Sequence, residues 1–129
     1  MGLTSEALAD ACALVAYFSK AKGMSRTGCD AIESGALVSP ITVWELTLKA
    51  SAGRLPHLPT SNDSFGGWLL ERGLRIQPLT WADAERANRL PPIHKDPMDR
   101  ILIAQALNAG LTIITNDRSF AAYGVATIW

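Results

Sequence analysis

The stretch HKDPMDRILIAQA, residues 94–106, places two carboxylates, Asp96 and Asp99, at the start of an apolar helical pattern. Asp96 followed by Pro97 predicts a helix start, with a side-chain acceptor at the N-cap and proline at the first helical position. Asp99 would then lie in the first turn, where a carboxylate interacts well with the helix N-terminus and can close a capping box. Capping needs only one acid, so Asp99 is also a candidate metal ligand.

Three further acids occupy comparable places. Asp10 and Asp117 each end a predicted strand, and Glu45 lies one turn into the helix that follows the strand GALVSP. Taken singly, Asp117 fits an Asx turn and Glu45 fits a solvated helix face. Taken together with Asp99, carboxylates that crowd in one place repel one another unless a cation neutralises them. Such a cluster is a place for Mg²⁺ or Mn²⁺, which take oxygen ligands.

The elements that would position these acids alternate along the chain. Strands rich in β-branched or apolar residues are expected at 6–10, 35–40, 74–80, 111–117 and 125–129. Helical patterns lie between them, at 12–20, 25–34, 41–52, 64–72, 81–89 and 97–109. This alternation predicts an α/β fold with a parallel sheet and helices on both faces. In such sheets functional groups gather at the carboxyl ends of the strands, which is where all four acids map.

Composition limits the class of protein. The 129 residues, 48% of them apolar, predict a single domain spanning 1–129 around one core. No apolar run is long enough to cross a bilayer, and the N-terminus has no basic start, so we expect a cytoplasmic protein with Cys12 and Cys29 as reduced thiols. The turn-rich interval 51–63 is expected to be a surface connection. Twelve basic residues balance 12 acidic ones, which argues against a broad nucleic-acid-coating surface but allows a local basic patch.

Four segments carry a resemblance to a known family: LADACALVAYF, VSPITVWELTLKASAGRL, HKDPMDRILIAQAL and GLTIITNDRSFAAYGV. Over nearly its whole length the chain resembles a PIN-domain ribonuclease, in particular a VapC-type toxin of a bacterial toxin–antitoxin pair. The resemblance implies a three-layer α/β/α fold with a central parallel sheet. It also places the acidic quartet of the family on Asp10, Glu45, Asp99 and Asp117, the residues chosen above by position.

The implied reaction is Mg²⁺- or Mn²⁺-dependent hydrolysis of RNA phosphodiester bonds, with the metal polarising a phosphoryl oxygen and activating water. We expect Asp10 and Asp99 to be the firmest metal ligands, with Asp117 completing the site directly or through water. Glu45 either binds the metal or orients the attacking water. Thr115, or the hydroxyl of Ser39, is a further candidate for positioning a ligand or a phosphate.

RNA must also meet positive charge near this site. The candidates are Lys20, Lys22, Arg26, Lys49 and Arg54, and Arg100 is expected either to pair with Asp99 or to contact phosphate. Other side chains are assigned to structure: His94 is expected to be a solvated loop residue and Trp44 a core residue. For Trp68, Trp81 and Trp129 we expect packing or partner contacts rather than stacking on RNA bases.

The resemblance further implies a structured RNA substrate of the tRNA kind, a VapB-type antitoxin whose tail enters the acidic site, and a homodimer. A phosphatase of the dehalogenase type would need a D-x-D pair, but Asp10 is followed by Ala11 and Cys12. A dinucleotide-binding domain would need G-x-G-x-x-G after the first strand, and the sequence has none. The remaining alternative is a PIN-like domain that binds a partner without catalysis.

Overall fold

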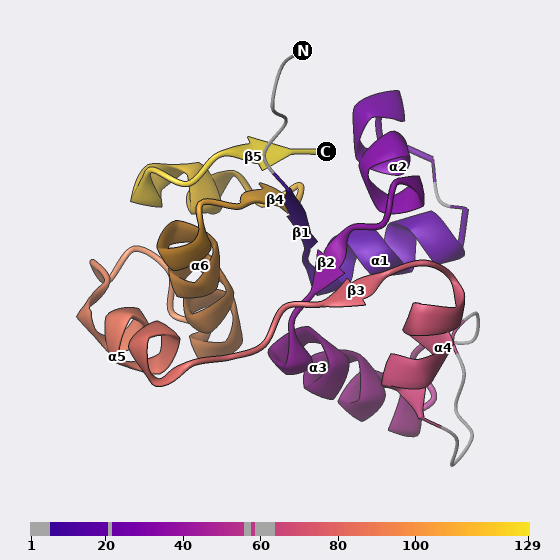
Figure 1. Cartoon of the computed structure of the whole chain (residues 1–129), viewed down its shortest axis with the longest axis horizontal. Helices are drawn as coiled ribbons and strands as arrows, with labels where there is room; N and C mark the ends of the chain where they lie inside the picture. Colours follow the sequence, from indigo (N-terminus) through magenta and orange to yellow (C-terminus); the bar gives the residue numbers. More distant parts are fainter. Residues whose placement is uncertain (1–5, 21, 56–57, 59–63) are drawn as a thin grey trace.

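A five-stranded parallel sheet runs through the middle of the computed structural model, which describes residues 6–20, 22–55, 58 and 64–129 (Figure 1). Its order is β3-β2-β1-β4-β5. The chain therefore builds outward from β1 on one side, then crosses over to β4 on the other side of β1. This reversal is a topological switch point, the place where open parallel sheets bind ligands. The strands are β1 (Ala7–Ala9), β2 (Leu37–Val38), β3 (Arg75–Ile76), β4 (Thr112–Ile114) and β5 (Thr127–Ile128).

The helices lie close to their predicted ranges, whereas the strands are shorter than predicted. The first two strands stop early because the next residue already caps a helix: Asp10 caps α1 and Ser39 caps α3. Each cap residue is itself still extended, and the chain turns into the helix directly after it. The helices are α1 (Ala11–Phe18), α2 (Arg26–Glu33), α3 (Pro40–Ser51), α4 (Phe65–Glu71), α5 (Trp81–Arg89) and α6 (Pro97–Ala109), followed by the 3-10 helix η1 (Arg118–Tyr123).

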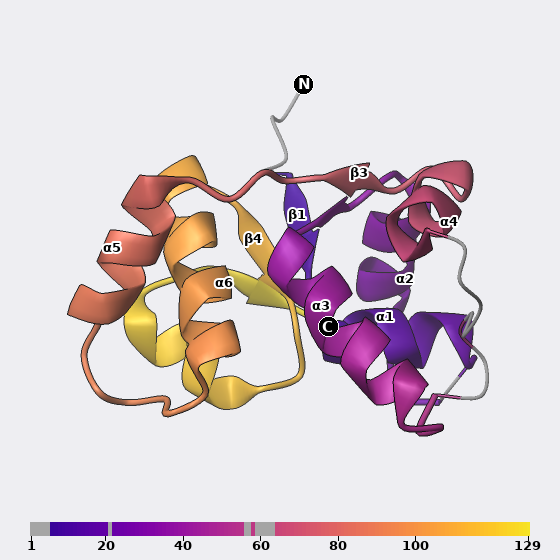
Figure 2. The same cartoon turned by 90° about the horizontal axis from the view of Figure 1, so that it is seen from below.

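Helices cover both faces of the sheet, which confirms the three-layer α/β/α prediction (Figures 1 and 2). Alternate residues of a strand point to opposite faces, and the two cores follow this rule. Leu8 and Ile113 belong to a cluster with α6 and η1, whereas Ala9 and Ile114 belong to a cluster with α1 to α4. Two apolar layers therefore hold the short strands in register from both sides.

The helix α6 is capped at both ends and buried through its middle. As predicted, Asp96 is its N-cap, with the side chain accepting from the backbone N–H of Met98 at 2.9 Å, and Pro97 occupies the first turn. Five consecutive residues of α6, Leu102 to Ala106, are buried. Gly110 ends the helix in the left-handed region at φ 67°, which glycine adopts without steric cost.

Two expectations are revised or untested at this level. Trp44 is not a core residue: its side chain is 54% exposed, because α3 turns it away from the sheet toward solvent. The connection predicted at 51–63 lies largely outside the described residues. In the described part of the chain, no helix is long and apolar enough to cross a membrane.

The layered packing gives a prediction for stability. Ile113 is completely buried in β4, between β1 and β5. Ile113→Ala should lower the free energy of unfolding by about 2–5 kcal/mol, because a cavity remains under α6. The matched control is Trp81→Ala, since Trp81 is 89% exposed and its loss should change stability by less than about 0.5 kcal/mol. Equilibrium urea unfolding measures both, and equal losses would contradict this packing.

Candidate metal centre

The four predicted acids line one open cleft of about 600 Å³ at the carboxyl edge of the sheet. Asp10 follows β1 and is buried, Asp99 lies in the first turn of α6, and Asp117 follows β4 and caps η1. Glu45 reaches the same cleft from α3. Since β1 and β4 are adjacent in the sheet, Asp10 and Asp117 meet at the switch point. The structure thus brings together the residues that the sequence selected by position.

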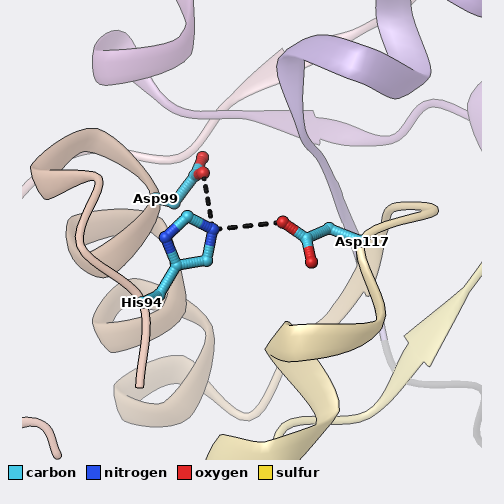
Figure 3. Close-up of side chains that lie close together, drawn as sticks. All are labelled: His94, Asp99 and Asp117. Carbon is cyan, nitrogen blue, oxygen red and sulfur yellow. Dashed lines mark hydrogen bonds and ion pairs between the residues drawn. The ribbon is translucent and has the colours of Figure 1, made fainter. Parts of the chain in front are cut away.

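His94 is a member of this cluster that the sequence analysis missed. Its Nε2 atom lies 3.1 Å from Oδ2 of Asp99 and 3.1 Å from Oδ2 of Asp117 (Figure 3). Its side chain is only 16% exposed, so it is not the solvated loop residue that was expected. The sequence feature that could have indicated this role is its position two residues before the N-cap Asp96. In the structure the backbone N–H of Asp96 donates to Nδ1 of His94 at 3.2 Å.

The segment that carries His94 is fixed by Arg100 and Tyr123. The Arg100 guanidinium donates to four backbone carbonyls, those of Ala87, Leu90, Pro91 and His94, at 2.8–3.2 Å. The Tyr123 hydroxyl accepts from the backbone N–H of His94 at 2.7 Å and donates to the carbonyl of Pro91 at 2.9 Å. Arg100 was expected to pair with Asp99 or with phosphate. Its donors are instead used on the chain preceding α6, because that segment has carbonyls without a partner in a helix or strand.

Two carboxyl groups in the cleft hold their protons unusually tightly. Burial, assisted by the negative charge of Asp96, raises the pKa of Asp99 to about 7. Burial also raises the pKa of Asp10 to about 6, against the opposing effect of hydrogen bonds from the Thr115 side chain and the backbone N–H of Ala13. Both shifts mean that the charged forms lack sufficient compensation. A cation in the cleft would supply it.

Asp117 behaves in the opposite way. Burial alone would raise its pKa, but hydrogen bonds from Ser119 and His94 outweigh burial and lower the pKa. Oδ1 accepts from the backbone N–H and the hydroxyl of Ser119, at 2.9 and 2.7 Å, while Oδ2 accepts from His94. Asp117 is therefore a charged carboxylate with both oxygens already engaged.

The two hydroxyls predicted to help position a ligand or a phosphate are both buried. The Thr115 hydroxyl hydrogen-bonds to Asp10, a candidate metal ligand, and accepts from the backbone N–H of Asp117 at 3.1 Å, so it contacts two acids of the cleft. Ser39 is also buried and accepts from the backbone N–H of Ile41 as the N-cap of α3. Neither residue is among those that line the cleft.

Positive charge lies along the same cleft. Lys22, Lys49 and Arg54 line it, whereas Lys20 and Arg26 are not among its lining residues. Lys49 Nζ pairs with Oε2 of Glu45 at 2.8 Å, one helical turn apart. Of the tryptophans, Trp129 lines the cleft, and Trp68 packs between Phe18 and Phe65 beneath the guanidinium of Arg72.

The donor chemistry of the cluster fits a divalent cation. Ligand atoms of Asp99, Asp117 and His94 lie within 4.8 Å of one another, and Asp10 adds a carboxylate to the same cleft. Carboxylate oxygens are the preferred ligands of Mg²⁺ and Mn²⁺. The raised pKa values of Asp10 and Asp99 are a second observation in favour of this fit, because they identify uncompensated negative charge.

Comparison with known proteins assigns the family. The model of the PIN domain matches residues 7–126, so the chain belongs to the PIN-domain family. This match covers every strand and helix from β1 to η1 and ends just before β5. Sequence comparison with curated proteins gives no significant match.

Solved structures with the same fold are distant in sequence. The chain is similar to a chain of the DNA-bound VapBC complex from Salmonella typhimurium, with 16% identity, a TM-score of 0.67 and coverage of 96% and 97% of the two chains. It is similar to a chain of a toxin–antitoxin complex from Klebsiella pneumoniae, with 21% identity, a TM-score of 0.64 and coverage of 96% and 97%. It is also similar to a chain of FitAcB from Neisseria gonorrhoeae, with 20% identity, a TM-score of 0.62 and coverage of 95% and 96% of the two chains. At these identities the likeness shows the fold.

The acid cluster predicts an unusual dependence of stability on pH. Asp10 and Asp99 have folded-state pKa values of about 6 and about 7, above the ordinary value of 3.8, so the folded chain binds protons more tightly than the unfolded chain. The stability contributed by this binding is fully present near pH 4 and is lost as the pH rises through 6 and 7, on the order of 1 kcal/mol per pH unit and group.

Urea unfolding in EDTA between pH 5 and 8 measures this loss. Asp99→Asn should flatten the profile, since an amide does not titrate, and should be as stable as the parent chain or more so at pH 8. Asp30→Asn, on the exposed surface of α2, is the matched control and should leave the slope unchanged. A parent chain whose stability rises over this range would contradict the assignment.

Proposed function

We propose that this PIN domain is a Mg²⁺- or Mn²⁺-dependent endoribonuclease, the toxin component of a VapBC-like toxin–antitoxin system acting in the cytoplasm. The observation that carries the proposal is the crowding of Asp10, Glu45, Asp99 and Asp117 in one cleft at the sheet's switch point. Two of these carboxyls are destabilised as anions, which a structural role alone does not require.

Within this proposal the metal, when bound, neutralises charge at the phosphate and activates water. Asp10 and Asp99 are the direct ligands, because burial leaves their charge uncompensated. Asp117 completes the site directly or through water; in the metal-free chain Ser119 and His94 engage both of its oxygens. Glu45, held by Lys49, lines the same cleft and orients the attacking water.

The substrate proposed is a short, exposed single-stranded element of a structured RNA such as a tRNA. Lys22, Lys49 and Arg54 give the cleft a local positive edge that suits phosphates. With a net charge of zero, the chain has no wide electrostatic footprint for a long duplex, so shape and local contacts must select the site.

A VapB-type antitoxin and a second copy of the chain are the proposed protein partners. The names of the similar structures describe toxin and antitoxin complexes, which supports an antitoxin here. Large apolar side chains remain on the surface of this chain, among them Trp44 and Leu48, one turn apart on α3, and Trp81. Exposed apolar side chains of this size favour association. The alternative is a PIN domain that binds such partners without cleaving RNA.

Substitution of Asp99 tests catalysis. Asp99→Asn should reduce RNA cleavage at least about 100-fold while the chain stays folded, because a metal ligand is lost but no packing is removed. Asp96→Asn is the matched control: it lies three residues away, retains a good N-cap and should keep most of the activity. The assay compares cleavage with Mg²⁺, with Mn²⁺ and with EDTA, by both variants. Wild-type cleavage by Asp99→Asn, or cleavage that persists in EDTA, would refute the proposal.

Mapping of RNA ends tests the substrate. Total cellular RNA incubated with the protein and Mg²⁺ should acquire discrete new ends in one or a few structured RNAs, and the rate should fall only moderately with salt. Lys49→Ala should slow cleavage of this RNA without abolishing metal binding, as expected for a positive side chain at the cleft edge. Progressive trimming from RNA termini, or cleavage confined to duplexes, would exclude this substrate class.

A further inference from the structure

His94 occupies an unusual position for a side chain beside a candidate metal centre. Figure 3 shows its ring edge directed between Asp99 and Asp117, and its Nε2 atom lies 3.1 Å from one carboxylate oxygen of each. Ligands about 2.1 Å from a six-coordinate divalent ion lie about 3 Å from one another. By distance alone, His94 could therefore be a third ligand or a substitute for the ion.

The hydrogen bonds of the ring decide between these two roles. The backbone N–H of Asp96 donates to Nδ1 at 3.2 Å, so Nδ1 carries no proton. A neutral imidazole has one ring proton, and here that proton must lie on Nε2. Nε2 is then a donor, hydrogen-bonded to Oδ2 of Asp117, with Oδ2 of Asp99 at the same distance. A nitrogen that carries a proton has no lone pair to give to a metal.

This position is built rather than incidental. The backbone of His94 is fixed on both sides, through its N–H by Tyr123 and through its carbonyl by Arg100. Its ring packs edge-on against Phe120, with centroids 5.6 Å apart. Three side chains and one backbone amide thus hold the Nε2–H donor against the two acids, and none of these contacts depends on a metal.

We propose that His94 is not a metal ligand but a substitute for the ion: its Nε2–H holds Asp99 and Asp117 together in the metal-free chain, and the ion that joins these carboxylates must displace it. The inference rests on the proposed function in requiring that a divalent ion binds there. An ion held by both carboxylates would take the place of the Nε2 proton, since Nε2 lies 3.1 Å from an oxygen of each. His94 therefore competes with the metal and sets the affinity of the site.

The proposal fixes the sign of a mutational effect. Removing the imidazole takes away the competing donor and leaves the carboxylates less compensated, and both changes favour a cation. His94→Ala should therefore bind Mn²⁺ about fivefold more tightly, the equivalent of one hydrogen bond. If His94 were a ligand, the same substitution would weaken binding. His94→Gln keeps an N–H donor on a side chain of similar reach and should bind Mn²⁺ with about the affinity of the parent chain.

Calorimetric titration of the full chain with Mn²⁺ at one pH measures these affinities. Ile93→Ala, an exposed and uncharged neighbour on the same segment, is the matched control and should match the parent chain. Pulsed electron paramagnetic resonance of Mn²⁺ bound to the parent chain gives a second readout, because a coordinated imidazole nitrogen couples directly to the ion. We expect no such coupling. This measurement, together with His94→Gln, decides the question even if His94→Ala does not fold.

Weaker or unchanged Mn²⁺ binding by His94→Ala, an equal gain in Ile93→Ala, or a directly coordinated nitrogen would overturn the inference about His94 and leave the proposed nuclease intact. Absence of Mn²⁺ binding by the parent chain and by His94→Ala at millimolar concentration would overturn both. Tighter binding by His94→Ala alone, with no nitrogen coupling in the parent chain, is the result that supports it.

Discussion

Burial of several carboxylates in one cleft is the constraint on which the rest of this site depends. Asp10, Asp99 and Asp117 come from three separate segments, and each brings negative charge to the same edge of the sheet. Burial raises the cost of ionising Asp10 and Asp99, and like charges nearby add to that cost. Hydrogen bonds from Ser119 and His94 stabilise the negative charge of Asp117 and lower its pKa. The charges of Asp10 and Asp99 are not stabilised to the same extent, and their pKa values are raised.

The acids do not divide into structural and functional ones. Asp10 caps α1 and Asp117 caps η1, yet both also line the cleft. A carboxylate has two oxygens, and a cap needs only one of them. At α6 the two tasks are split between neighbours: Asp96 caps the helix, while Asp99, three residues later, faces the cleft. The start of α6 therefore carries two acids because capping and lining the cleft are done by different residues.

Each acid of the cleft adjoins a packed element. The apolar remainder of α6 is buried against the sheet, which fixes the direction of its first turn and hence of Asp99. Arg100, the next residue, holds the preceding segment through backbone carbonyls and so fixes His94 over the same acids. Adjacent residues on one helical turn therefore place both members of the His94–Asp99 contact.

The sequence by itself determined the α/β layering, nearly all element positions and the four acids, because hydrophobic periodicity, capping residues and strand ends are local signals. It did not determine what His94, Arg100 and Trp44 do. His94 meets Asp117, 23 residues away, and Arg100 meets carbonyls up to 13 residues back, so their partners exist only after the chain has folded. The exposure of Trp44 likewise depends on which side of α3 packs against the rest of the fold. Tertiary structure alone decided these contacts, because a side chain's hydrogen-bond partners are set by proximity in space.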